Sequence, residues 1–178
     1  MGTPREPRAT KYFAALLSSS REILAGVEND LVEVLGEIDG RSEVVPWVAS
    51  QYYEGEMGSE LLRRFISFSR LASAEDLATV KLRTQQIEDR YRAPTSGGRR
   101  VNLDPGYIDA YKVVLASTKN AGQRLYLRSG IYAEATLMFY DRGFHGLAYT
   151  YPDYLWPEAL AFFAQLRSAY LAQLRRLD

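Results

Sequence analysis

The chain has 178 residues, a length that suits one domain, and its 47% hydrophobic and 25% charged residues make an ordinary globular composition. It contains no cysteine, which excludes disulfides, thiolate metal sites and cysteine nucleophiles. The 22 basic residues balance 22 acidic ones, so no overall positive field would draw the protein onto DNA or an anionic membrane. A site for an anion must therefore be built locally.

The N-terminal residues 1–10 combine prolines with charges and are expected to form a flexible terminus ahead of a single domain, residues 11–178. The apolar run from Tyr12 to Leu17 is too short for a signal-peptide core or a membrane span. Together with Lys11 it has the length and apolarity of a buried strand. We expect a cytoplasmic protein with no membrane partner.

A helix is predicted behind the serine cluster at residues 18–20. Ser19 with Glu22 three positions later forms a capping box, apolar residues recur at helical spacing, and Gly36 is placed to end the helix. Residues 38–50 then fit a strand with an edge or bulge at Pro46.

A second strand and a second helix follow. Residues 63–71 alternate in the manner of a strand, and Ser73 is placed to cap an amphipathic helix over residues 74–91. Residues 100–103 resemble a strand that runs into a turn at residues 104–107. In that turn Pro105 would preset the first turn position and Gly106 would tolerate a positive φ.

The last part of the chain carries a hairpin signal and a final helix. Residues 108–117 are ambiguous, because so short a run fits a helical turn or a strand equally well. Ser129 and Gly130 separate two strand-like segments, 124–128 and 131–140. Pro157 stands at the first position of a helix with an apolar stripe.

This order of elements predicts an α+β fold. Helices would pack on one face of a mainly antiparallel sheet, in a ferredoxin-like arrangement with additional strands and a C-terminal helix.

The segment Val101-Asn102-Leu103-Asp104-Pro105-Gly106-Tyr107 resembles a bacterial and archaeal family, domain of unknown function 4416, whose hallmark is Asp-Pro-Gly-Tyr. The resemblance continues in the family's order through residues 53–58, 115–119, 124–127, 130–134 and 150–154. It implies a cytoplasmic bacterial protein of about this length. It implies no activity, because the family is uncharacterised.

Four carboxylates are candidate catalytic residues: Glu54, Glu56, Asp104 and Glu134. Glu54 and Glu56 would face the same way if their segment is extended. With Asp104 they could hold magnesium, which takes oxygen ligands and often bridges to phosphate. The alternative is that these residues are surface carboxylates or helix caps.

The hallmark segment supplies candidate ligand-binding residues. Asn102 and Asp104 would share one face of a strand while Val101 and Leu103 enter the core. Asp104 could instead bond its own turn backbone, but a turn needs neither Asn102 nor the Tyr107 hydroxyl.

Basic residues concentrate after the hallmark. Lys112, Lys119 and Arg124 suit a phosphate-bearing ligand, since arginine offers a bidentate fork and lysine a point charge. The alternative is a solvated strand face with ion pairs to Glu134 or Asp141. The many tyrosines suit base stacking as well as sheet packing, and His145, in a Gly-Phe-His-Gly loop, is a weaker candidate for a general base.

Two functions follow as hypotheses. The first is binding of a phosphate-containing, nucleotide-like small molecule, with magnesium-assisted phosphoryl or nucleotidyl chemistry if the protein is an enzyme. The second is a non-catalytic protein- or RNA-interaction module, in which tyrosine and arginine contact a protein partner, a second copy of the chain or RNA. An enzyme should gather the named carboxylates and cations in one concave pocket.

Overall fold

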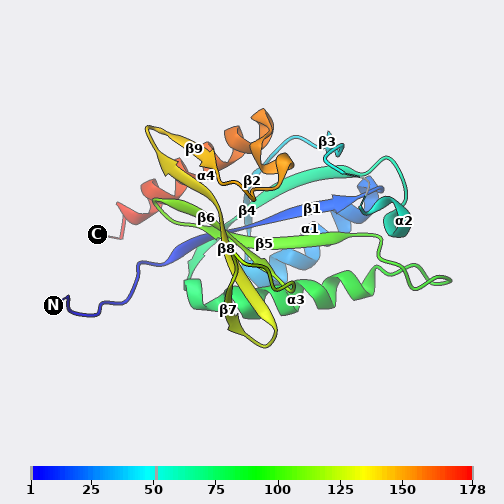
Figure 1. Ribbon diagram of the computed structural model, residues 1–178, viewed down its shortest axis with the longest axis horizontal. Coiled ribbons are helices and arrows are strands. Elements are labelled where there is room, and N and C mark those ends of the chain that lie inside the picture. Colours follow the sequence, from blue (N-terminus) through cyan, green and yellow to red (C-terminus); the bar gives the residue numbers. More distant parts are fainter. Residues whose placement is uncertain (1, 51, 178) are drawn as a thin grey trace.

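The computed structural model describes residues 2–50 and 52–177, and it has an antiparallel sheet at its centre. In space the strands follow the order β2-β4-β1-β5-β6-β8-β7, with β3 paired to β4 and β9 paired to β8 (Figure 1). The elements are β1 Thr10–Ser18, α1 Arg21–Leu35, β2 Ile38–Arg41, β3 Val45–Pro46, α2 Glu54–Met57, β4 Leu62–Ala72, η1 Ala74–Asp76, α3 Leu77–Arg90, β5 Asn102–Ile108, β6 Lys112–Ser117, β7 Leu125–Arg128, β8 Ile131–Tyr140, β9 Gly143–Gly146, η2 Pro152–Leu155 and α4 Pro157–Leu174. The protein is therefore of the α+β class.

The first half of the chain forms the expected ferredoxin-like unit. Its strands lie in the order β2-β4-β1-β5, and α1 and α3 cover the same face of the sheet. Tyr12, Ala14 and Leu16 of β1 point toward these helices, because alternate residues of a strand share a face.

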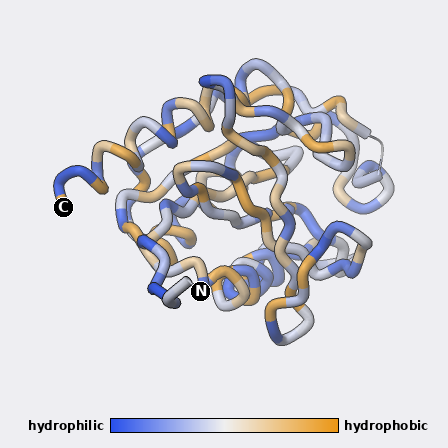
Figure 2. The backbone as a smooth tube through the Cα atoms, turned by 60° about the vertical axis from the view of Figure 1, so that its left-hand side comes forward, coloured by the Kyte–Doolittle hydropathy of each residue, from blue (hydrophilic) through white to orange (hydrophobic). Residues whose placement is uncertain are grey.

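The C-terminal helix α4 covers the opposite face. Phe13 and Ala15 of β1 point toward it, and the rings of Phe13 and Phe163 meet edge to face with centroids 5.0 Å apart. Strand β1 is consequently buried along its whole length, as its unbroken apolar sequence predicts. Figure 2 shows hydrophobic stretches on the strands that cross the middle of the molecule, while the C-terminal end of the chain is hydrophilic. None of the helices within residues 2–50 and 52–177 has the length and apolarity needed to cross a bilayer.

Two local predictions for the first half are corrected. The cap of α1 is Ser20, whose Oγ accepts from the Ile23 amide, whereas Ser19 Oγ donates to the Met57 carbonyl. Residues 38–50 do not form one strand; they contain the short strands β2 and β3, and Pro46 ends β3 at the sheet margin, where its missing donor costs little.

The hallmark Asp-Pro-Gly-Tyr segment is not a turn, contrary to the prediction. It lies inside β5, between β1 and β6, and Gly106 is not among the glycines with positive φ. Glycine is required there by close packing. A Cβ at this position would lie 2.4 Å from the Val114 carbonyl oxygen and 2.6 Å from Cζ of Phe13.

Pro105 ends the pairing of β5 with β6. The two strands pair only at Gly106–Leu115, Tyr107–Val114 and Ile108–Val113, so the next pair in register would join residue 105 to Ala116. Backbone donors alternate sides along a strand, and Pro105 falls on the side of β6 but has no N–H to give. The two strands separate at this point.

The remaining segments settle the ambiguous part of the sequence. Residues 108–117 hold the end of β5 and all of β6 rather than a helix. The β7–β8 hairpin is confirmed, with Ser129 and Gly130 both at positive φ. The Gly-Phe-His-Gly segment is strand β9 and not a loop, because residues 141 and 142 make the positive-φ turn that folds it back onto β8.

Gly106→Ala should destabilise the protein by about 2 kcal/mol or more, since the added methyl group meets backbone on one side and a buried ring on the other. Urea unfolding followed by circular dichroism measures this. Gly122→Ala, where a Cβ meets nothing within 4 Å, is the control and should change stability little. Equal stability of the two variants would contradict the packing explanation.

Candidate functional site

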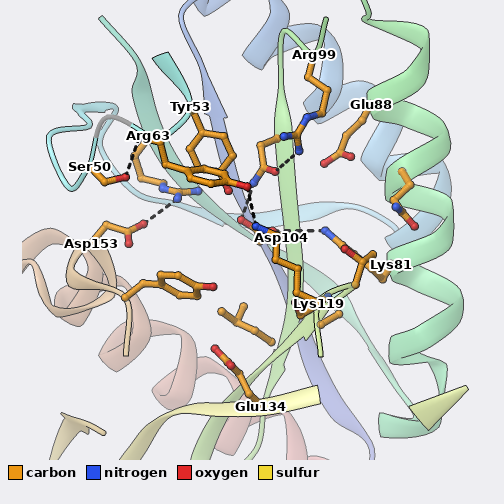
Figure 3. A pocket seen from close by; sticks show the side chains of 18 of the residues that line it. Ser50, Tyr53, Arg63, Lys81, Glu88, Arg99, Asp104, Lys119, Glu134 and Asp153 are labelled. Atoms are coloured by element: carbon orange, nitrogen blue, oxygen red, sulfur yellow. Dashed lines mark hydrogen bonds and ion pairs between the residues drawn. The ribbon is translucent and has the colours of Figure 1, made fainter. Parts of the chain in front are cut away.

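A pocket of about 440 Å³ opens where β5 and β6 separate. Its walls come from segments far apart in the chain: the loop after β3, the start of β4, α3, β5, β6 with the loop that follows it, β8 and η2. This volume lies within the range of small-molecule sites. Figure 3 shows the labelled side chains converging on the space from several sides.

Arg63 of β4 is a buried cation at one side of the pocket. Its side chain is 4% exposed, and Nη2 lies 2.8 Å from Asp153 Oδ2, which is equally buried. The Nε and Nη1 donors of Arg63, and Nε1 of the nearby lining residue Trp47, have no hydrogen-bond partner within residues 2–50 and 52–177. Buried donors of this kind are normally satisfied, so this side of the pocket can accept an anion.

Lys119 stands in the loop after β6 and is an exposed pocket cation. Its ammonium donates to the Tyr52 hydroxyl at 2.9 Å, lies 4.5 Å from the centre of that ring and lowers the pKa of Tyr52. Among the described residues it forms no ion pair with a carboxylate. Its charge therefore remains available to a ligand.

Aromatic rings form another part of the wall. Tyr53 lies between two other rings, with its centroid 5.5 Å from that of Trp47 and 4.9 Å from that of Tyr52. The Arg99 guanidinium carbon lies 5.7 Å from the centre of the Tyr53 ring. Such rings offer stacking surface to a planar ligand.

Arg124 lines the pocket and is held in place by hydrogen bonds to protein groups. Its Nε donates to Glu134 at 2.7 Å, Nη1 to the Lys119 carbonyl at 2.9 Å and Nη2 to the Tyr151 hydroxyl at 2.9 Å. Both partners of the Arg124–Glu134 pair are buried, with side chains 6% and 1% exposed. The pair fixes the loop that carries Lys119.

Asn102 and Asp104 share one face of β5, as strand alternation requires, and lie in a polar network. Asn102 Nδ2 donates to Asp104 Oδ2 at 2.7 Å, and Arg99 Nη1 donates to Asn102 Oδ1 at 3.3 Å. Arg99 in turn is paired with Glu56, with Nη2 and Oε2 2.6 Å apart, and its hydrogen bonds lower the pKa of Glu56.

Helix α3 supplies three pocket residues that sequence reasoning missed: Lys81, Gln85 and Glu88. Beyond Pro105 the edge of β5 has no strand partner, and α3 fills that role: Leu103 N–H donates to Glu88 Oε1 at 2.6 Å, and Lys81 Nζ donates to the Leu103 carbonyl at 2.7 Å. These three polar residues adjoin the buried stripe of Val80, Thr84 and Ile87 on α3. A polar residue beside such a stripe was the signal in the sequence that could have identified them.

The predicted residues thus divide between locations. Asn102, Asp104, Lys119, Arg124 and Glu134 line the pocket, and Glu56 adjoins it through Arg99. Glu54 and Glu56 do not face the same way, because their segment is the short helix α2 and residues two apart on a helix point in different directions. Glu54 is exposed.

Tyr107 and Lys112 lie elsewhere, in a separate groove beside α4 that also contains Asp109. Lys112 is ion-paired with Asp109, and the ring of Tyr107 contacts that of Tyr12. His145 is stacked on Tyr140 with ring centroids 3.9 Å apart and does not line the pocket.

The three candidate magnesium ligands, Glu54, Glu56 and Asp104, are not gathered. Within the described part of the chain no group of three or more acidic or histidine side chains is placed to hold a metal ion.

Glu88 carries an electrostatic cost. It is 7% exposed, and burial raises its pKa, against the opposing effects of Lys81 and the Leu103 amide. A raised pKa means that the folded state disfavours the ionised form, so this cost is present above the raised pKa and disappears as the pH falls below the ordinary value of 4.5.

Glu88→Gln should therefore raise the melting temperature at pH 7, since glutamine keeps an acceptor for the Leu103 amide without a buried charge. The gain should shrink as the pH is lowered toward 4.5 and below. Thermal unfolding across this pH range measures the effect. A variant less stable than the wild type at pH 7 would contradict this account of Glu88.

Comparison with known proteins places the chain in a family. No curated protein and no solved structure was found to match the chain. The family model described as Domain of unknown function (DUF4416) matches residues 8–170, nearly the whole chain, and the protein belongs to that family.

Proposed function

We propose that the pocket binds a phosphate-containing small molecule of nucleotide type. The observation that carries the proposal is Arg63, a buried guanidinium with two unpartnered donors at a concave site that Lys119 also lines. Arginine forks and lysine ammonium groups are the side chains that hold phosphate oxygens most strongly.

The position of the unpaired cation supports a ligand whose anionic group lies at Arg63 and Lys119. The cations Arg63, Lys81, Arg99 and Arg124 each have a carboxylate partner, whereas Lys119 has none among the described residues. A single added negative group would therefore meet one uncompensated charge and, at Arg63, two unused donors. The rings of Tyr52, Tyr53 and Trp47 favour a ligand that also carries a planar group.

The proposal concerns binding, and magnesium would enter with the ligand. Phosphates commonly bring the ion with them and share it with one or two protein carboxylates. Asp104 of β5 is the pocket carboxylate that could bind this magnesium ion. Phosphoryl or nucleotidyl transfer would require such an ion or an equivalent cation opposite the phosphate.

Thermal shift with nucleoside mono-, di- and triphosphates, with and without magnesium, tests the proposal. A ligand at about 100 times its dissociation constant adds roughly 2.7 kcal/mol, which for a chain of this size is a rise of about 5 to 10 °C. Lys119→Ala should weaken binding about tenfold or more, the size of one charge-assisted hydrogen bond.

Lys112→Ala is the matched control, since this lysine lies in the separate groove and should bind nucleotides as the wild type does. If no phosphate compound stabilises the wild type, the proposal fails. Equal losses in the two variants would place binding outside the pocket.

A second function, protein interaction, is favoured by β7. This edge strand exposes three large apolar side chains in a row, Leu125, Tyr126 and Leu127, at 74%, 62% and 40%. An unprotected apolar edge is a surface on which another strand can pair. This function would be favoured if no phosphate compound stabilises the protein and if its apparent mass in solution rises with protein concentration. Leu125→Ser should then lower that apparent mass.

A further inference from the structure

The α3 wall of the pocket presents hydrogen-bonding groups different from those at Arg63. Glu88 and Gln85 are one turn apart on α3, so their side chains are neighbours on one face of the helix, and both line the pocket. Figure 3 shows Glu88 and Arg63 reaching the space from opposite sides, with Asp104 between them.

Glu88 has acceptor capacity that the protein does not use. Its Oε1 accepts from the Leu103 amide, and the hydrogen bonds of residues 2–50 and 52–177 include none to Oε2. It also has no ion pair there: the Lys81 ammonium is bound to the Leu103 carbonyl at 2.7 Å and lies 3.4 Å from Asp104. Glu88 is 7% exposed and lines the pocket, so Oε2 is an acceptor that a donor on a ligand can use.

Gln85 supplies the complementary group. It is half-buried, and no hydrogen bond within the described part of the chain involves its amide. Together the two side chains offer an amide donor beside carboxylate acceptors. A ligand that matches them presents an acceptor next to two N–H donors.

We propose that Gln85 and Glu88 recognise a guanine base, so that the pocket is a guanine-nucleotide site with phosphate at Arg63 and Lys119. This inference rests on the function proposed above. The guanine edge consists of the O6 acceptor followed by the N1–H and N2–H donors, which match the Gln85 amide and the Glu88 carboxylate. Adenine presents one donor on this edge and would leave part of the buried carboxylate unpaired.

The aromatic residues distinguish a base from other donors. An aliphatic amine joined to a phosphate would also satisfy Glu88 and Arg63, but it would make no use of Trp47 and Tyr53. Phosphoethanolamine is therefore included in the test as a non-aromatic ligand that joins an N–H donor to a phosphate.

Isothermal titration with GMP, IMP, AMP and phosphoethanolamine tests the proposal on the wild type, Glu88→Gln and Glu54→Gln. IMP differs from GMP by the missing 2-amino group alone. The wild type should bind GMP about tenfold or more tightly than IMP or AMP, because a site built for a donor is left with an unpaired buried acceptor when the donor is absent. Phosphoethanolamine should bind weakest.

Glu88→Gln should abolish the preference for GMP over IMP and weaken the binding of both, because an amide NH2 group replaces the oxygen that accepts from the base. The glutamine still accepts from Leu103, and a melting curve verifies that the variant is folded. Glu54→Gln changes an exposed carboxylate outside the pocket and should retain the preference.

The outcomes separate the two proposals. Guanine recognition would be overturned if all the nucleotides bind equally well and Glu88→Gln does not change their affinity. If Lys119→Ala still weakens their binding, the phosphate site remains supported. Preferred binding of phosphoethanolamine would likewise overturn recognition of a base. If none of these compounds binds the wild type, both proposals fail.

Discussion

The amide nitrogen of Pro105 carries no hydrogen, and the candidate site depends on that missing donor. Strand β5 pairs with β6 up to Gly106 and Leu115, and the next rung would need the N–H that proline lacks. Beyond it the strands separate inside a sheet that is otherwise continuous from β2 to β7. A central strand is an unusual place for proline. Here it converts part of a buried sheet into an open-walled pocket.

The opening of the sheet explains why charged side chains are buried around it. Backbone groups at the freed edge of β5 still need partners, and Glu88 and Lys81 of α3 provide them at Leu103. The ion pairs Arg63–Asp153 and Arg124–Glu134 line other sides of the pocket. Buried pairs of this kind contribute little net stability compared with apolar packing. Their concentration around one cavity supports the proposal that the cavity binds a ligand.

Within this arrangement the cations differ in what they can do. Arg124 donates from Nε, Nη1 and Nη2 to Glu134, the Lys119 carbonyl and Tyr151, so protein groups hold it and it positions the loop. Arg63 retains unpartnered donors, and the hydrogen bond and ring contact of the Lys119 ammonium within the described residues are both with Tyr52. The ligand-facing charge is thus set by which cations lack partners. Residue type alone does not reveal it.

Elements with local signals could be predicted from the sequence: the buried strand β1, the amphipathic helices α1 and α3, the β7–β8 hairpin at Ser129 and Gly130, and α4 from Pro157. Their order predicted the α+β class and the ferredoxin-like unit. This was possible because periodicity and turn chemistry depend on residues that are close together in the sequence. That Asp-Pro-Gly-Tyr lies within a strand depends on tertiary contacts, since the need for Gly106 comes from Phe13 of β1 and Val114 of β6. The tertiary structure also brought Asn102, Asp104, Lys119, Arg124 and Glu134 into one pocket, sent Tyr107 and Lys112 to another groove, and added Arg63 and Glu88. A pocket is made by strand order and by where pairing stops, and both depend on contacts between segments that sequence spacing does not encode.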